Sequence, residues 1–316
     1  MPTPAFTFNQ SDINNSVNNN IAVLLKQAGM RVNGDIKLTR LTEGFSEALV
    51  YKVENSGNAY TLKIFPARWG MDVANTFYKF ASGNGIPTPK ILHSSGPSEA
   101  CPGHFVLTEW VDSELLNKIG KWGGQYGYGK EAGILLKRVH GIKTGGFGFL
   151  NSKNQWTCRS AAAICDLWIK RISDKLDPCL SNMWQEILEK TLMSNRLRDF
   201  SNPVLLHGDF CVNNIFYQKK LLSGKIVGLI DAAGPVSGDP MSDLGNTQTT
   251  NSAHLISKGI WDGYTKRQKL TEEEHNRFLR WRLVHQFFAI CKSIICKDNK
   301  TSKLLKYIHP FMREVD

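Results

Sequence analysis

The residues with the clearest chemical potential follow a short apolar run. That run ends in His-Gly-Asp at residues 207–209, and Asn214 lies five residues after the aspartate. A carboxylate and a carboxamide on one tight loop can accept a proton and can hold a hard metal ion through oxygen. Asp209 is therefore a candidate base, and Asn214 is a candidate metal ligand.

A second acidic residue follows another apolar run. Asp231 lies 22 residues beyond Asp209, directly after the stretch KIVGLI. Two acids at strand ends this close in sequence predict a hairpin that presents both to one cleft. Asp231 and Asn214 would form an oxygen-only pair suited to Mg²⁺ that carries phosphate ligands, and Asp209 would be left to take a proton.

The polar residues around these two segments are expected to have structural roles. Asp239 precedes Pro240, which predicts an N-cap followed by proline at the first helical position. We expect Asp243 to be a further structural support and His207 to hold the shape of its loop. No motif places a histidine beside Cys211, so this cysteine is not indicated as a nucleophile.

The N-terminal third predicts a small sheet. A helix capped near residue 11 would end near Gly29, and residues 35–65 alternate β-branched and aromatic residues with polar ones around a turn at 55–58. A helix-like stretch at 73–80 and a strand at 104–111 follow. Lys63 lies inside an apolar strand, where a lysine needs an anionic partner.

The rest of the chain is mainly helical in pattern. The glycine-rich stretch 120–133 is interpreted as a flexible connection, and helical spacing begins at residue 134. Two β runs interrupt the helices near residues 203–234, and Thr271 begins a capping box for the last long helix. We predict an α+β fold of two lobes, with residues 1–112 as a nucleotide-binding lobe and residues 113–316 as a helical lobe.

Composition limits the possible partners and locations. The 316 residues carry 39 Lys and Arg against 28 Asp and Glu, a net charge of +11, which favours anionic partners. The basic residues are scattered, so we expect no nucleic-acid partner. The seven cysteines include no Cys-x-x-Cys pair, and no signal peptide or membrane-spanning run is visible. A cytoplasmic protein without a membrane partner is expected.

These motifs together resemble a known family. His207-Gly208-Asp209 with Asn214, followed by Asp231 and by Gly238-Asp239-Pro240, is similar to the signature of the aminoglycoside phosphotransferase and choline kinase-like superfamily. The resemblance implies the bilobal protein-kinase fold, with a small N-terminal sheet lobe and a larger helical C-terminal lobe. It implies ATP or GTP as the nucleotide, Asp209 as the catalytic base, and Asn214 and Asp231 as Mg²⁺ ligands.

The same resemblance assigns nucleotide contacts in the N-terminal half. Residues 43–48 correspond to the turn that covers the phosphates, where Ser46 would bind phosphate oxygens. Lys63 corresponds to the lysine that holds the α- and β-phosphates. The backbone of Glu109 and Val111 would read the adenine edge. The family's glutamate partner of this lysine is missing, and Asp72 is a weak candidate for it.

Three functional hypotheses follow. The first is a kinase that phosphorylates a hydroxyl of a small molecule, with an aminoglycoside-like antibiotic as the leading acceptor, which would make the protein an antibiotic-resistance enzyme. The second is a metabolic kinase for a choline-, ketosamine- or homoserine-like metabolite. The third, a catalytically silent binding protein, is disfavoured because the candidate base and metal ligands are both retained. We expect a monomer or a homodimer.

The acceptor is the least determined part of the prediction. A net charge of +11 would repel a polycation unless the cleft is locally acidic. The candidates for an acidic rim are Glu272, Glu273, Glu274, Glu314 and Asp316. The aromatic candidates for binding a quaternary ammonium group are Trp261, Tyr264 and Trp281.

Overall fold

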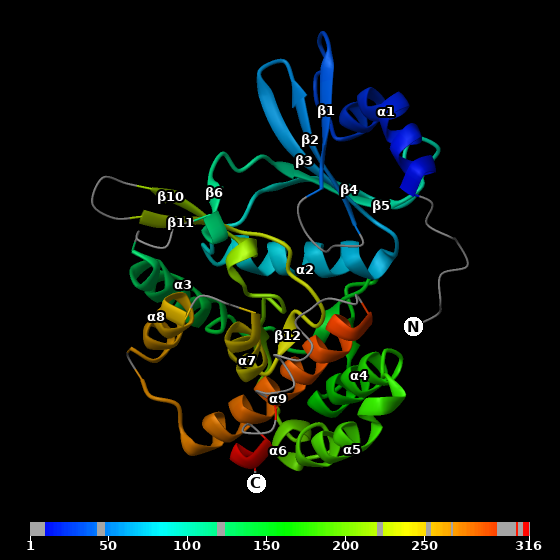
Figure 1. Ribbon diagram of the computed structural model, residues 1–316. Helices are drawn as coiled ribbons and strands as arrows, with labels where there is room; N and C mark the ends of the chain where they lie inside the picture. The colour runs from blue at the N-terminus through cyan, green and yellow to red at the C-terminus, as the bar shows by residue number, and fades with distance from the viewer. Residues whose placement is uncertain are drawn as a thin grey trace.

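The computed structural model shows two lobes, with the sheet of the first lobe above the helices of the second (Figure 1). Each helix in the described part of the chain is too short or too polar to cross a membrane. The predicted division at residues 112 and 113 falls just after the last strand of the sheet. The described residues are 10–42, 48–118, 124–219, 224–250, 254–266, 268–295, 308 and 312–315.

The first lobe is built on a five-stranded antiparallel sheet in the order β1-β2-β3-β5-β4. Apolar residues at alternate positions of β2 and β3 form a core with α1, as their period of two requires. Lys63 lies in β3 opposite Val50 and Val106, between buried Leu62 and Ile64. The elements are α1 (Gln10–Gln27), β1 (Ile36–Leu41), β2 (Leu49–Asn55), β3 (Asn58–Phe65), β4 (Ile91–Ser95) and β5 (His104–Glu109).

The helix α2 (Arg68–Gly83) lies between the sheet and the second lobe (Figure 1). It begins at Arg68, five residues before the predicted start at residue 73, and its first turn also buries Gly70 and Met71. Its buried face includes Phe77, which joins the core of the second lobe. This helix therefore connects the two cores.

The second lobe combines helices with short strands that hold the central loops. Leu229 at the end of β11 donates its N–H to the carbonyl of Pro87 at 2.9 Å, which joins this lobe to the segment after α2. The elements are β6 (Glu114–Leu115), α3 (Gln125–Val139), β7 (Phe147–Leu150), β8 (Trp156–Cys158), α4 (Ala161–Ser173), α5 (Ser181–Lys190), α6 (Asn195–Arg198), β9 (Val204–Leu205), β10 (Ile215–Lys219), β11 (Gly224–Leu229), β12 (Ser237–Gly238), α7 (Pro240–Thr250), α8 (His254–Thr265) and α9 (Glu272–Ile295).

The structure corrects the interpretation of the glycine-rich stretch 120–133 as a flexible connection. From Gln125 onward this stretch is the first half of α3, which packs against α8. A Cβ on Gly133 would lie 2.1 Å from the carbonyl oxygen of Ile260, and a Cβ on Gly263 would lie 2.1 Å from that of Lys130. The glycines therefore allow two helix backbones to approach each other, a role that local sequence does not reveal.

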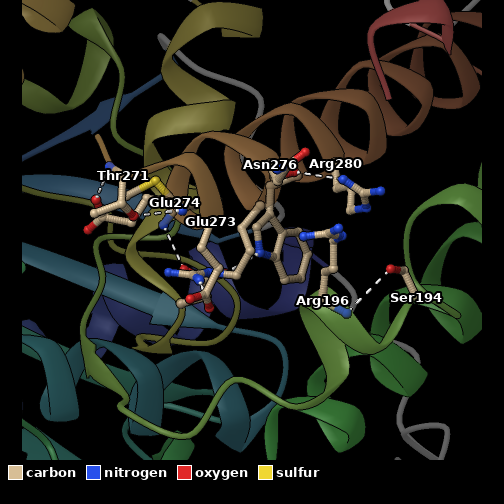
Figure 2. Close-up of polar contacts among 11 residues, drawn as sticks. Ser194, Arg196, Thr271, Glu273, Glu274, Asn276 and Arg280 are labelled. Carbon is tan, nitrogen blue, oxygen red and sulfur yellow. Dashed lines mark hydrogen bonds and ion pairs between the residues drawn. The ribbon is translucent and has the colours of Figure 1, made fainter. Parts of the chain in front are cut away.

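The last long helix begins as predicted. The Thr271 N–H donates to the Glu274 carboxylate at 2.8 Å, and the Glu274 N–H donates to the Thr271 hydroxyl at 3.2 Å (Figure 2). This reciprocal pair is a capping box. Phe278 and Phe287 of α9 are buried in the core of the second lobe.

We predict that Gly133→Ala lowers the free energy of unfolding by about 1–3 kcal/mol, because the added methyl group overlaps the α8 backbone. Gly127→Ala is the matched control, since it lies in the same helix with no atom within 4 Å of the added Cβ. That change should be neutral or stabilising by up to ~1 kcal/mol. Denaturant unfolding of both variants is the measurement, and equal destabilisation would contradict the close contact of α3 with α8.

Candidate active site

A hairpin of two strands brings the predicted site residues together. Asn214 immediately precedes β10, Asp231 follows β11 by two residues, and the two strands pair in antiparallel fashion. The Asn214 Nδ2 donates to both the backbone carbonyl and the carboxylate of Asp209, each at 2.9 Å. The Ile230 N–H donates to the Asn214 carbonyl at 3.0 Å. The loop before the hairpin and the segment after it therefore meet at one place.

Two residues at this place have left-handed backbone conformations. Gly208 has φ of +75°, and a Cβ there would lie 1.7 Å from the carbonyl oxygen of Ala233, so only glycine fits. Asp231 has φ of +60°, a conformation that a short polar residue tolerates better than a branched one. The Ala233 N–H donates to the His207 carbonyl at 3.0 Å, which joins the two turns.

A buried carboxylate holds the loop that carries Asp209. Asp243, on α7, accepts hydrogen bonds from the backbone N–H groups of His207 at 2.6 Å and Gly208 at 2.7 Å. Its Oδ2 also lies 3.2 Å from the Nε2 of His140, and the His140 Nδ1 hydrogen-bonds to the Tyr264 hydroxyl at 2.8 Å. Burial alone would raise the pKa of Asp243, but the hydrogen bond and charge of His140 lower it below its ordinary value.

The histidine of the His-Gly-Asp motif is part of the core. The His207 ring is fully buried and makes edge contacts with the rings of Phe77 and Phe210. Burial lowers its pKa despite the opposing effect of Asp243, so the ring is neutral at neutral pH. A neutral, enclosed imidazole fits a structural role in shaping the loop.

The predicted structural role of Asp239 agrees with its contacts. Its Oδ1 accepts from the Met241 N–H at 3.1 Å at the start of α7, as an N-cap does. Its Oδ2 accepts from Arg277 Nε at 3.1 Å and from Trp281 Nε1 at 3.0 Å, which connects α7 to α9. Burial raises the pKa of Asp239, and the charge of Arg277 opposes that effect.

Lys63 finds its anionic partner on the other lobe. Its Nζ lies 2.7 Å from Oδ1 of Asp231, and the two side chains are 18% and 36% exposed. Asp72, the weak candidate for this role, instead forms an ion pair with Arg68 at 3.4 Å. Asp72 therefore pairs within α2 with the arginine four residues earlier, and Asp231 occupies the position next to the lysine.

The predicted nucleotide contacts lie partly within the described residues. Glu109 ends β5, and its N–H donates to the Lys90 carbonyl at 3.1 Å. Val111 lies just after β5, and its side chain is 3.7 Å from the position of a Cβ on Gly228 in β11. The segment that follows β5 therefore packs against the second lobe. Ser46 lies outside the described residues.

The donor set near Asp231 fits magnesium. The amide nitrogen of Asn214 is used by Asp209, which leaves the carboxamide oxygen as its ligating atom, and Asp231 offers a carboxylate. Mg²⁺ accepts such oxygen ligands and takes the others from water and phosphate. Among the described residues no group of three or more His, Cys, Asp and Glu could hold a metal ion, so a soft-metal centre is not indicated there.

Sequence reasoning missed three residues that structure brings to the site. His140 and Tyr264 extend the hydrogen bonds of Asp243 into α3 and α8. Tyr78 of α2 is close enough to Asp231 that this charge adds to the effect of burial in raising the tyrosine pKa. The surrounding sequence gave no signal for these roles, because each depends on a partner far along the chain.

The three aromatic candidates for binding an ammonium group do not lie together. Tyr264 is buried with Lys137 Nζ 4.6 Å from its ring centroid, Trp281 binds Asp239, and Trp261 packs on Phe278. The three aromatic residues therefore form no common cage for an ammonium group. Burial raises the pKa of Cys211 to about 12, which agrees with its exclusion as a nucleophile.

Comparison with known proteins identifies the family. Residues 37–278 match the model of the phosphotransferase enzyme family, APH, and this range covers both lobes. The chain belongs to this family. It is a phosphotransferase with a hydroxyl acceptor, and the predicted aminoglycoside phosphotransferase-like resemblance is confirmed. A search of curated proteins found no match.

Solved structures show the fold of this phosphotransferase. The structure of aminoglycoside phosphotransferase APH(4)-Ia matches with a TM-score of 0.72 and 15% identity, covering 95% of this chain and 98% of that one. A thermostable mutant of APH(4)-Ia in a ternary complex with ADP and hygromycin B matches at 0.70 and 15%, covering 92% and 97%. A proposed fructosamine-3-kinase from Haemophilus somnus 129PT matches at 0.64 and 15%, covering 96% and 99%. The predicted α+β, protein-kinase-like architecture is confirmed.

We predict a pH dependence of stability from His285, which is buried in α9 beside Ser242. Burial lowers the pKa of His285 from 6.5 to about 4. Its contribution is complete above pH 6.5 and is lost as the pH falls toward 4, because the unfolded chain then binds a proton that the folded one does not. The loss is on the order of 3 kcal/mol.

His285→Gln should remove this contribution while keeping a polar group near Ser242. Denaturant unfolding between pH 7 and 4 should therefore show a shallower fall in stability for the variant. His275→Gln, on the exposed face of α9, controls for the loss of one imidazole elsewhere in the helix. Parallel pH profiles for wild type and His285→Gln would show that the buried imidazole does not titrate as argued.

Proposed function

We propose that this phosphotransferase transfers the γ-phosphate of ATP or GTP to a hydroxyl group of a small molecule. The observation that carries the proposal is the meeting of four predicted residues at one place. Asp209 and Asn214 are joined by hydrogen bonds, and Asp231 is joined to Lys63 across the two lobes. A base, two oxygen ligands and a cation are the groups that phosphoryl transfer requires.

Each residue has a role that its contacts support. Asp209 accepts the proton of the acceptor hydroxyl, and the Asn214 amide holds its carboxylate in place through a 2.9 Å hydrogen bond. Asn214 and Asp231 hold Mg²⁺, which neutralises charge on the phosphates when bound. Lys63 binds the α- and β-phosphates, so the nucleotide competes with Asp231 for its ammonium group.

The proposed nucleotide contacts beyond Lys63 involve the segment after β5 and Ser46. The carbonyl of Glu109 and the N–H of Val111 read the adenine edge at the end of β5. Ser46, which lies outside the described residues, is assigned to phosphate oxygens by the family resemblance alone. The structural neighbour with bound ADP supports nucleotide use in this fold, although the contacts of this chain rest on its own residues.

Two acceptor classes are carried forward. An aminoglycoside-like antibiotic is supported by the similarity to APH(4)-Ia, whose complex contains hygromycin B. A metabolite of the ketosamine, choline or homoserine type is supported by the similarity to the proposed fructosamine-3-kinase. Both similarities are at 15% identity and concern the fold.

Replacement of the base tests the reaction. Asp209→Ala should bind nucleotide normally but release ADP in the presence of an acceptor at least ~10²-fold more slowly, since a positioned general base contributes about that much. The exposed Asp199→Ala should retain wild-type turnover and serves as the control. Near-normal turnover in the Asp209 variant would remove this residue from the role of base.

Replacement of the metal ligand tests a different step. Asp231→Asn should require more Mg²⁺ for half-maximal turnover, because the carboxamide is a weaker ligand, and high Mg²⁺ should restore part of the activity. The measurement is ADP release across a Mg²⁺ titration at saturating nucleotide. Parallel titration curves for the variant and wild type would rule out a metal role for Asp231.

A further inference from the structure

A nearly buried arginine in the helical lobe is held by carbonyl groups and by no carboxylate among the described residues. Arg280 of α9 is 9% exposed, and its Nη1 and Nη2 donate to the carbonyls of Asn276 at 3.1 Å and Val315 at 3.3 Å. Its Nε is buried, and it has no hydrogen-bond partner within the described part of the chain. Two neutral carbonyls engage two of the five N–H groups of a guanidinium and leave its charge unbalanced.

A second arginine lies next to Arg280. Figure 2 shows the side chain of Arg196, on α6, pointing toward the guanidinium of Arg280. Burial lowers the pKa of Arg280, and the nearby charge of Arg196 lowers it further. Arg196 itself is exposed. Two like charges beside a buried region repel each other, and a buried charge without a counter-ion is unfavourable.

The acids of the surrounding elements pair with other arginines. These ion pairs are Asp166 with Arg198 at 2.9 Å, Glu273 with Arg277 at 2.6 Å and Glu314 with Arg282 at 3.7 Å. Asp199 follows α6, but across the described ranges no ion pair includes Arg196 or Arg280. Glu273 and Glu314, considered above for the acidic rim of the acceptor cleft, are therefore engaged in local pairs.

The charge of the arginine pair favours a dianion. A carboxylate carries one negative charge and would balance one guanidinium, whereas a phosphate group carries close to two charges at neutral pH. Guanidinium groups bind phosphate oxygens through strong, charge-assisted hydrogen bonds, and three such oxygens can serve two arginines at once. The chemistry of the pair is therefore that of a phosphate site.

We propose that Arg196 and Arg280 together bind the phosphate group of a small molecule on the helical lobe. The helices that carry them, α6 and the first half of α9, lie toward the end of this lobe that is farthest from the sheet (Figure 1). The site is thus separate from the phosphate contacts proposed for Lys63, which is in the sheet. This inference does not depend on the proposed kinase function. A phosphate bound there joins α6 to α9 and stabilises the folded lobe.

Thermal unfolding tests for the site. The midpoint of the wild-type protein is recorded with increasing sodium phosphate, with sodium chloride adjusted to keep the ionic strength constant. A saturating non-hydrolysable ATP analogue occupies the proposed nucleotide site throughout. The midpoint should rise with phosphate, because a ligand that binds the folded chain stabilises it by mass action. A midpoint that depends on ionic strength alone would overturn the proposal.

One pair of variants makes the role of the arginines specific. Arg196→Gln should weaken phosphate binding at least ~10-fold in calorimetry, because one of two charge-assisted contacts is lost. In chloride alone this variant should unfold at the same or a higher temperature than wild type, since a like charge beside Arg280 is removed. Arg159→Gln removes the same charge from an exposed position before α4 and should bind phosphate as wild type does. Equal weakening in both variants would show attraction by net charge and contradict the site.

A carboxylate of the chain itself is the competing anion. Asp316 follows Val315 and lies outside the described residues. Asp316→Asn should leave phosphate binding unchanged or strengthen it. A lower unfolding midpoint of Asp316→Asn, together with no phosphate binding by the wild-type protein, would show that this carboxylate balances the arginines and would overturn the proposal.

Two phosphate compounds separate the possible sources of the group. Calorimetry compares inorganic phosphate with glucose 6-phosphate, and glucose is the uncharged control. Binding of both phosphates that requires Arg196 would assign the site to phosphate monoesters, and binding of inorganic phosphate alone would assign it to the free ion. Absence of Arg196-dependent binding of both compounds would reject the site, whatever phosphotransfer activity the protein shows.

Discussion

The position of the loop that carries Asp209 depends on the buried carboxylate of Asp243. It accepts two backbone N–H groups of the His207-Gly208 turn at 2.6 and 2.7 Å, and these bonds orient the residue that follows, Asp209. A buried carboxylate without partners is unfavourable by several kcal/mol, so the charge and the turn need each other. His140 supplies the third contact and connects this centre to Tyr264 in α8.

The packing of the helical lobe allows these contacts of Asp243 to form. Glycines at the contact of α3 with α8 let their backbones approach, which brings His140 at the end of α3 within reach of Tyr264. The contact of α7 with α9 is secured by Asp239 through Arg277 and Trp281. Asp239 caps α7 and Asp243 lies in its first turn, so α9 holds this helix at its start and the helix holds the His207-Gly208 turn through Asp243.

Charge is distributed unevenly between the two ends of α9. Glu273 and Glu274 at its start are used in an ion pair with Arg277 and in helix capping, whereas residues 281–295 contain no Asp or Glu. The Arg171 guanidinium of α4 lies against the rings of Trp168 and Phe288.

Sequence alone predicted which residues are candidates for the chemistry and determined in what kind of element each lies. Asp209, Asn214 and Asp231 follow from short motifs, and Lys63 from its place in an apolar strand, because these signals depend on neighbours within a few positions. The capping box of α9 and the strands around Lys63 were predictable for the same reason. The glycines of α3 were misinterpreted, since their function depends on a helix more than 120 residues away.

Only the tertiary structure decided which side chains these residues contact. Lys63 and Asp231 are 168 residues apart, and His140 and Tyr264 are 124 apart, so no local periodicity relates them. Asp72 differs, because it pairs with Arg68 four residues earlier in the same helix, while the distant Asp231 takes the place beside the lysine. Residue type and spacing limit what a side chain can do, but which charge it meets depends on how distant segments pack, because a hydrogen bond needs direct contact and salt screens exposed charges beyond about 8–10 Å.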